Sequence, residues 1–162
     1  MKILPRSIAG FSLIELLASA AIIGLLATVA VPFVETAVKR QKEHDLRLAL
    51  NQIRQAIDAY KQATLDGRIA VTPDQSGYPL SLALLVGGVA NARPGYGPPV
   101  LYFLRRIPRD PFFPDASVAT IDTWALRSFD SPPDSPRSGS DVFDVHSQSA
   151  QTGLNGVPYK EW

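Results

Sequence analysis

The sequence predicts an α+β fold in which a long N-terminal helix packs its second half on a small antiparallel sheet with long loops. Three observations support this prediction. Residues 16–34 carry no charge and are mostly aliphatic. An apolar stripe with helical spacing follows them, and beyond Gly67 prolines and glycines recur between short runs typical of strands. The chain therefore changes character twice, from lipid-like to amphipathic and then to proline-rich.

The uncharged segment is long enough to cross a membrane, because a helix needs about 20 apolar residues to span about 30 Å of hydrocarbon. Residues 1–10 precede it, contain two cations and lack an apolar stretch of their own. In a secretory signal peptide, cleavage follows the apolar region and removes it. Cleavage after Gly10 would instead leave the anchor in the mature protein. We therefore expect residues 1–10 to be a cleaved leader and residues 11–34 to be a transmembrane helix.

Charges on the two sides of this segment do not settle its orientation. Lys2, Arg6 and the initiator amine precede the apolar residues, whereas Lys39, Arg40 and Lys42 follow them. Because the positive-inside rule compares the cations that flank a span, the balance favours neither orientation.

Helical periodicity continues after the anchor, as an apolar stripe with spacings of four and three. We predict one helix from about Phe11 to Leu65, with residues 35–66 as its amphipathic continuation and Gly67 as a natural stop. Pro32 cannot donate to the helical ladder and should kink or loosen the helix. The stripe consists of Leu46, Leu50, Ile53, Ile57 and Tyr60.

Residues 67–162 are predicted to form an extracytoplasmic α+β domain. Its prolines and glycines argue against long helices, although residues 80–86 favour a short helical turn. Residues 123–129 and 141–145 contain Trp, Val and Phe in short runs typical of antiparallel strands. Residues 130–140 between them are predicted to be a loop.

Composition excludes several classes of protein. The chain has 162 residues, a formal net charge of +1 and no cysteine. A nucleic-acid-binding protein usually presents a strongly basic face, so nucleic acid is not expected as a partner. Disulfides, thiolate nucleophiles and cysteine-based zinc sites are excluded.

The run Gly10-Phe11-Ser12-Leu13-Ile14-Glu15-Leu16-Leu17 resembles the processing site of type IV pilins and of the pseudopilins of type II secretion systems. The resemblance implies that a prepilin peptidase cuts after Gly10 and that Phe11 is then N-methylated. Glu15 becomes the fifth mature residue, and Pro32 matches a proline that these proteins carry about two-thirds of the way along the apolar stretch. It also implies the type IV pilin fold.

Further segments resemble the major, G-type pseudopilin of type II secretion. They are Tyr78-Pro79 with the leucine-rich residues 80–86, then residues 107–112, in which Phe112 stands where a tryptophan is usual, and residues 143–147. This resemblance implies a structural subunit that polymerises through its N-terminal helix to drive export of folded proteins. Implied partners are identical subunits, minor pseudopilins and the inner-membrane secretion platform. The implied location is the bacterial inner membrane, single-pass, with the C-terminal domain in the periplasm.

Two other functions remain open. A surface type IV pilin for adhesion or motility is the alternative, although many such pilins close their C-terminal region with a disulfide that this chain cannot form. A plain single-pass anchored protein, with an accidental Gly-Phe motif, is the third.

Glu15 has two interpretations. Ser12 and Glu15 fit a capping box at the start of a helix. Alternatively, because a carboxylate at the bilayer centre costs about 2.5–3.5 kcal/mol on insertion scales, Glu15 could pair with the methylated Phe11 amine of a neighbouring subunit. Family resemblance implies the same pairing.

Small residues are expected to assist assembly. Ala20, Gly24 and Thr28 recur every four residues and so share one helix face. Small residues at this spacing allow close helix–helix approach in lipid.

No catalytic residue is predicted, and no cofactor is expected. Asp141 and Asp144 lie three apart on a predicted strand, which would point them to opposite faces. Calcium is the one metal considered, because residues 141–155 offer oxygen ligands. The resemblance implies a calcium loop there, but Gln151 stands where an aspartate is expected. Neither a calcium site nor any other metal site is therefore predicted.

Overall fold

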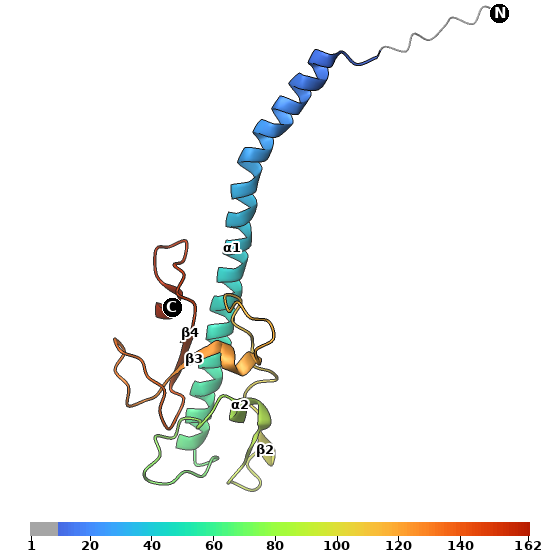
Figure 1. Ribbon diagram of the computed structural model, residues 1–162. Coiled ribbons are helices and arrows are strands. Elements are labelled where there is room, and N and C mark those ends of the chain that lie inside the picture. Colours follow the sequence, from blue (N-terminus) through green and yellow to red (C-terminus); the bar gives the residue numbers. More distant parts are fainter. Residues whose placement is uncertain (1–9) are drawn as a thin grey trace, which may run out of the picture. The chain divides into compact units, whose positions relative to one another are not determined.

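The computed structural model describes residues 10–162, apart from the side chains of Val29 and Ala30. Of the predicted leader, only Gly10 lies among these residues. The chain divides into two compact units between Lys39 and Arg40. Helix α1, Leu13–Leu65, contributes its first half to one unit and its second half to the other (Figure 1). The predicted single helix is thereby confirmed, with its start two residues later than expected.

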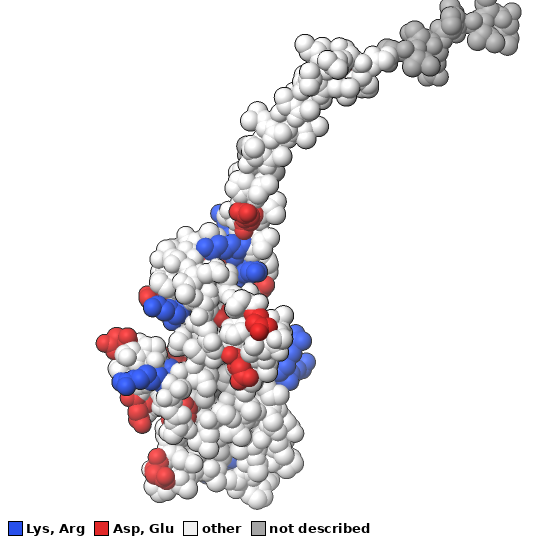
Figure 2. Space-filling view, viewed as in Figure 1, with Lys and Arg blue, Asp and Glu red and all other residues white. Residues whose placement is uncertain are grey.

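The first half of α1 exposes apolar side chains on all sides. Leu16, Ile22 and Phe33 are 59%, 60% and 71% exposed, and this stretch is almost entirely white in Figure 2. α1 is long and apolar enough to cross a membrane, and its most apolar window is unburied. A helix that is hydrophobic all round is stable only in lipid or inside protein.

Pro32 lies within α1 and does not end it. Lacking an N–H, Pro32 leaves the Thr28 main-chain carbonyl without its usual helical donor. The next turn is reinforced from a side chain, because Thr36 Oγ1 donates to the Pro32 carbonyl oxygen at 2.8 Å. The helical ladder is therefore weakened by one bond near Pro32 and continues beyond it.

The second half of α1 supplies the core of the second unit. The predicted stripe is confirmed, because Leu46, Ile53 and Ile57 are fully buried and Leu50 and Tyr60 almost so. Burying one such aliphatic side chain contributes about 1.5–3 kcal/mol. The stripe packs against residues from the rest of this unit: Ile69, Leu82, Leu85, Leu101, Phe112, Trp124, Val142, Val145 and Tyr159.

Helix α1 ends where the sequence predicts. Gly67 has a φ of 69°, in the left-handed region that favours glycine after a helix. The Arg68 N–H reaches back to the Ala63 carbonyl at 2.8 Å and satisfies one terminal carbonyl. A short helix α2, Ala83–Gly87, occupies the predicted helical turn.

The strands form two small antiparallel sheets instead of the single predicted one. Strands β3, Trp124–Arg127, and β4, Asp144–Ser147, pair with Trp124 opposite Ser147 and run alongside α1 (Figure 1). Strands β1, Val89–Ala90, and β2, Val100–Leu101, form the second sheet. Two 3-10 helices, Thr120–Thr123 and Tyr159–Glu161, flank this framework.

The predicted start of the last strand is wrong. β4 begins at Asp144, and Asp141 lies in the preceding irregular segment. The Asp141 carboxylate accepts hydrogen bonds from Ser128 Oγ and from the Phe129 N–H, both at 2.9 Å, and from Ser76 Oγ. These bonds hold the segment outside the ladder. Consequently, Asp141 and Asp144 do not share a strand.

Candidate functional site

The predicted processing site lies in an irregular segment just before α1. Gly10 and Phe11 are exposed, Phe11 by 76%. A Cβ added to Gly10 would meet nothing within 4 Å. Regular helical bonding starts with the Leu16 N–H, which donates to the Ser12 carbonyl at 3.1 Å. Among residues 10–162, no side chain crowds the position of Gly10.

Glu15 lies in the first turn of α1 and is exposed. A carboxylate at this end interacts favourably with the helix dipole. Its main-chain carbonyl accepts a hydrogen bond from Ser19 Oγ at 2.7 Å, so the Ser19 hydroxyl is satisfied within the helix. Whether the Glu15 carboxylate caps its own helix or pairs with a neighbouring subunit stays a prediction, because the second partner belongs to another chain.

Ala20, Gly24 and Thr28 are all exposed on α1. A Cβ at Gly24 would meet nothing within 4 Å. Thr28 Oγ1 donates to the Leu25 carbonyl at 2.7 Å, so its hydroxyl needs no partner from outside the helix. The side chains on this face are small, and the surface they form is largely apolar. Such a surface suits close helix contact, and its role in assembly stays a prediction.

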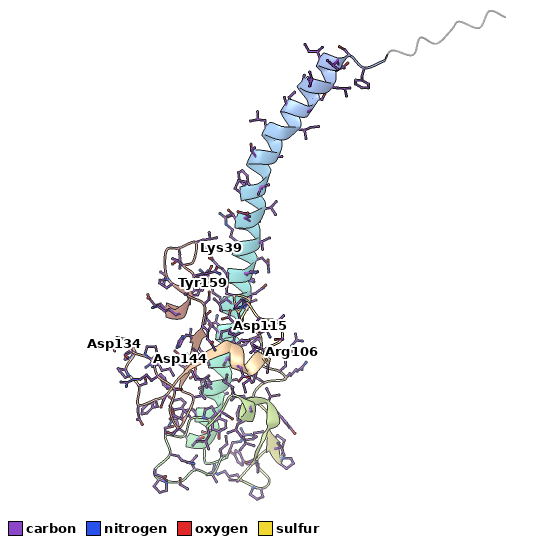
Figure 3. All side chains as sticks on the ribbon, viewed as in Figure 1. Lys39, Arg106, Asp115, Asp134, Asp144 and Tyr159 are labelled. Atoms are coloured by element: carbon purple, nitrogen blue, oxygen red, sulfur yellow. The ribbon has the colours of Figure 1, made fainter. Side chains whose placement is uncertain are left out.

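A buried carboxylate that sequence reasoning missed lies at the start of the second unit. Glu43 is 6% exposed, and its Oε1 accepts hydrogen bonds from the Leu154 N–H at 2.7 Å and from Tyr159 Oη at 2.9 Å. Figure 3 shows Tyr159 beside α1. Burial, with the Glu43 bond and charge, raises the pKa of Tyr159. Because Glu43 is three residues before Leu46, extending the apolar stripe by one turn would have found it.

A second buried carboxylate joins segments far apart in the chain. Asp110 is fully buried and accepts hydrogen bonds from Ser147 Oγ at 2.6 Å and from the Phe112 N–H at 2.8 Å. The Phe112 ring stacks on Tyr159 with centroids 4.0 Å apart. The aromatic ring that stands where a tryptophan is usual thus takes part in ring stacking.

Residues considered as calcium ligands lie in separate networks. Asp144, which Figure 3 labels, accepts at Oδ1 from Arg54 Nε at 2.7 Å. Asn155 Oδ1 accepts from the Val157 N–H at 3.1 Å. Ser147 is bonded to Asp110. Burial alone raises the pKa of Asp141, but its three hydrogen bonds and the nearby Lys61 charge lower that pKa overall. Within residues 10–162, no group of three acidic or histidine side chains is placed to hold a metal ion.

An open cleft of about 750 Å³ lies beside β4. It is lined by Arg54, Asp144 and His146, among others. Asp144 is already paired with Arg54, and the His146 ring nitrogen Nδ1 lies 3.3 Å from the Ser147 carbonyl. Among the described residues that line this cleft, no hydrogen bond joins His146 to a carboxylate.

Residues 5–31 match the prokaryotic N-terminal methylation motif. The matched residues include Gly10, Phe11 and Glu15, and Pro32 lies one residue beyond them. No curated protein and no solved structure matched the chain. The N-terminal segment thus carries a methylation motif of the prepilin type, which supports the pilin-like family, in which subunits are generally structural. Together with the apolar helix, the motif suggests membrane anchoring.

Proposed function

We propose that the chain is a structural subunit of a type II secretion pseudopilus. It polymerises through its N-terminal helix and drives export of folded proteins. The observation that carries this proposal is the methylation motif over residues 5–31, at the head of an apolar helix that the chain itself leaves unburied.

Polymerisation would replace lipid contacts of the apolar helix with protein contacts. Helix association in lipid depends on close packing and on polar pairs. The face of Ala20, Gly24 and Thr28 supplies the packing surface. A pair between Glu15 and the Phe11 amine of the next subunit would neutralise both charges and set a stagger of one subunit. Prepilin peptidase, identical subunits, minor pseudopilins and the inner-membrane platform are the proposed partners.

The segments that resemble the major pseudopilin contact one another in the domain. Tyr78 packs edge-on against Phe143, with ring centroids 5.0 Å apart. The Val142 N–H donates to the Pro79 carbonyl at 2.8 Å. The bond between Asp110 and Ser147 joins residues 107–112 to residues 143–147. The shared sequence features therefore form one packing unit.

A surface type IV pilin is the second candidate. The methylation motif supports it equally, since both kinds of subunit carry such a motif. The absence of cysteine disfavours it, because the C-terminal region cannot be closed by a disulfide. The hydrogen bonds of the buried carboxylates Glu43 and Asp110 hold that region instead.

Processing is the first expected result. Intact-mass measurement of the membrane-extracted protein should show loss of Met1–Gly10 and gain of one methyl group at Phe11. A Gly10→Val variant places a branched side chain at the cleaved bond and should accumulate uncleaved. A wild-type chain that retains Lys2 and Arg6 in the membrane would contradict any pilin-like role.

The second expected result is a loss of secretion when the chain is absent. Deleting the gene should leave exported folded proteins in the periplasm, and the wild-type chain supplied in trans should restore their export. Surface fibres and twitching motility should be unchanged. The opposite pattern, with motility lost and secretion intact, would assign the chain to a surface pilus instead.

A further inference from the structure

Two arginines that the proposed function does not use meet where α1 ends. Arg68 follows the terminating Gly67, and Arg93 lies on the loop between β1 and β2. The Ala92 N–H donates to the Arg68 carbonyl at 2.8 Å, which ties this loop to the end of α1 (Figure 1). We call Arg68 and Arg93 the arginine pair. Both residues belong to the second unit.

Each guanidinium group of the pair packs on a glycine. A Cβ added to Gly67 would lie 3.7 Å from Arg93 Nε, and a Cβ added to Gly97 would lie 3.3 Å from Arg68 Nη2. Both glycines have a positive φ, 69° and 97°, which favours glycine at these positions. Each arginine therefore lies against the main chain of the other one's segment, and two positive charges are held on one small surface.

The arginine pair has no anionic partner within residues 10–162. Neither guanidinium group forms an ion pair with a carboxylate there, and Arg68 Nε is buried without an acceptor. A buried donor without an acceptor is uncommon and destabilising. Arg93 is exposed, and its Cζ lies 5.9 Å from the centre of the Tyr96 ring. An acceptor from outside the chain would supply the missing charge.

The sequence around the pair also favours an anion. Residues 75–109 contain four arginines and neither aspartate nor glutamate. Asp66, the carboxylate nearest to Arg68 in sequence, accepts a hydrogen bond from Gln62 Nε2 at 2.9 Å. The net charge of the whole chain is only +1, so this stretch is a local concentration of positive charge. Such a surface attracts partners of the opposite sign.

The main chain of the loop distinguishes a carboxylate from a phosphate. Phosphate sites in loops commonly use several main-chain N–H groups that converge on the anion. Residues 91–99 include three prolines, which have no N–H. Four of the other six N–H groups already donate within the chain: those of Asn91, Ala92, Arg93 and Tyr96. Guanidinium groups need no such cradle, because they bind carboxylates through a planar fork of side-chain donors.

Exposed tyrosines on the same hairpin suit the surface of a protein. Tyr96 and Tyr102 are 70% and 66% exposed, and Tyr102 directly follows β2. The Tyr102 ring lies over Gly88, where an added Cβ would come within 2.6 Å of Tyr102 Cε1. Arginine and tyrosine are enriched among the residues that dominate binding between proteins. The tyrosines can contact apolar parts of a bound peptide while the arginines hold its carboxylates.

We propose that the arginine pair binds carboxylates of an acidic peptide segment on another protein. A segment with two or more carboxylates gives Arg68 and Arg93 one partner each, and Tyr96 packs beside them. This inference rests on contacts within the second unit alone. It therefore does not depend on the kind of fibre that the subunit builds.

The test measures peptide binding by the full chain in an uncharged detergent. A fluorescent oligo-aspartate peptide is titrated at low salt and followed by fluorescence anisotropy, with an oligo-asparagine peptide of equal length as the control probe. We expect saturable binding of the aspartate peptide alone. Binding should be lost in 1 M salt, where the Debye length is only about 3 Å.

Paired variants separate the arginine pair from overall charge. Arg68→Gln with Arg93→Gln should weaken binding about tenfold or more, because each exposed ion pair contributes up to about fivefold in affinity. The matched control, Arg105→Gln with Arg106→Gln, removes the same charge from exposed positions of the same acid-free stretch and should leave binding unchanged. Arg68→Lys with Arg93→Lys keeps the charge but loses the fork, so it should bind more weakly than the wild type.

Thermal melting checks that each variant is folded. Arg93→Gln alone, at an exposed position, should fold like the wild type and weaken binding up to about fivefold. It therefore tests the site even if the Arg68 variants do not fold. Dispersed subunits are measured, so a chain that fails to assemble or to support secretion leaves this result unaffected.

Three results would overturn the proposal: no binding of the aspartate peptide by the wild type, equal weakening by the two glutamine pairs, or wild-type binding by the Arg68 and Arg93 variant. Inorganic phosphate is added as a competitor. If it displaces the peptide at a similar concentration, the pair is a site for small anions and the peptide assignment is wrong.

Discussion

A Glu15→Ala variant is expected to be processed, inserted and folded like the wild type and yet to be unable to join a fibre. The substitution makes the span more apolar, so membrane insertion should not suffer. The Glu15 side chain is exposed on the first turn of α1, and Glu15 is far in sequence from the core that begins at Leu46. Folding of the second unit should therefore be unchanged.

The size of the effect separates the two interpretations of Glu15. If it only caps its own helix, its loss costs about 0.5–2 kcal/mol of local helix stability and leaves assembly intact. If it neutralises the Phe11 amine of a neighbour, the variant leaves an ammonium without a partner in an apolar core. That penalty is several kcal/mol for each subunit, and about 3 kcal/mol already lowers an association constant more than a hundredfold.

Crosslinking measures this assembly directly, because the chain has no cysteine of its own. Thiols introduced near residues 20 and 30 should give ladders in the wild type and only monomers with Glu15→Ala. Glu35→Ala is the matched control, since it removes the carboxylate just beyond the uncharged segment. Wild-type ladders and normal secretion from Glu15→Ala would leave Glu15 as a cap.

Periodicity explains which parts of the fold the sequence predicts well. The stripe from Leu46 to Tyr60 repeats over four turns, so its burial could be predicted without any partner being known. β1 and β2 have only two residues each, too few for an alternation to be recognised. The apolar residues after Asp141 predict a strand there, whereas the side-chain bonds of Asp141 to distant residues keep it outside the ladder.

The candidate site was predictable for a different reason. Gly10, Phe11 and Glu15 belong to a linear motif, so no tertiary contact is needed to find it. Glu43 bonds Leu154, which is 111 positions away in the chain, and Asp110 bonds Ser147, which is 37 positions away. Local patterns carry no information about such partners, and a buried carboxylate is assigned to the surface by default.

Glu43 gives the largest expected effect on stability. Among the described residues, every buried hydrophobic residue of the core lies at Leu46 or later, so residues 35–162 should fold as a soluble domain. In that domain, Glu43→Ala leaves the Leu154 N–H and the Tyr159 hydroxyl without their acceptor. Hydrogen bonds to a charged group are worth about 1.5–3 kcal/mol each. We expect a loss of about 3 kcal/mol and a fall in melting temperature of roughly 10 °C.

Asp45→Ala is the matched control, because Asp45 is exposed. Its side chain accepts one hydrogen bond within residues 10–162, from Gln41 Nε2 at 3.0 Å. Its cost should stay within about 0.5 kcal/mol. A double-mutant cycle of Glu43→Ala with Tyr159→Phe should give a coupling of at least about 1 kcal/mol, since the two side chains share one hydrogen bond. Equal melting of the Glu43 and Asp45 variants would refute the anchoring role.

The same soluble domain allows a test of whether calcium binds the C-terminal loop. Because the Glu43 carboxylate already holds Leu154 and Tyr159, and Gln151 removes a charged ligand, calcium has little left to organise in this loop. Calcium affinity rises with the charge of the ligand set. The wild-type melting temperature should thus be the same in chelator and in millimolar calcium. A calcium-dependent stabilisation of several kcal/mol requires calcium far above its dissociation constant, and it would show that oxygens of residues 148–156 bind the ion without the missing aspartate.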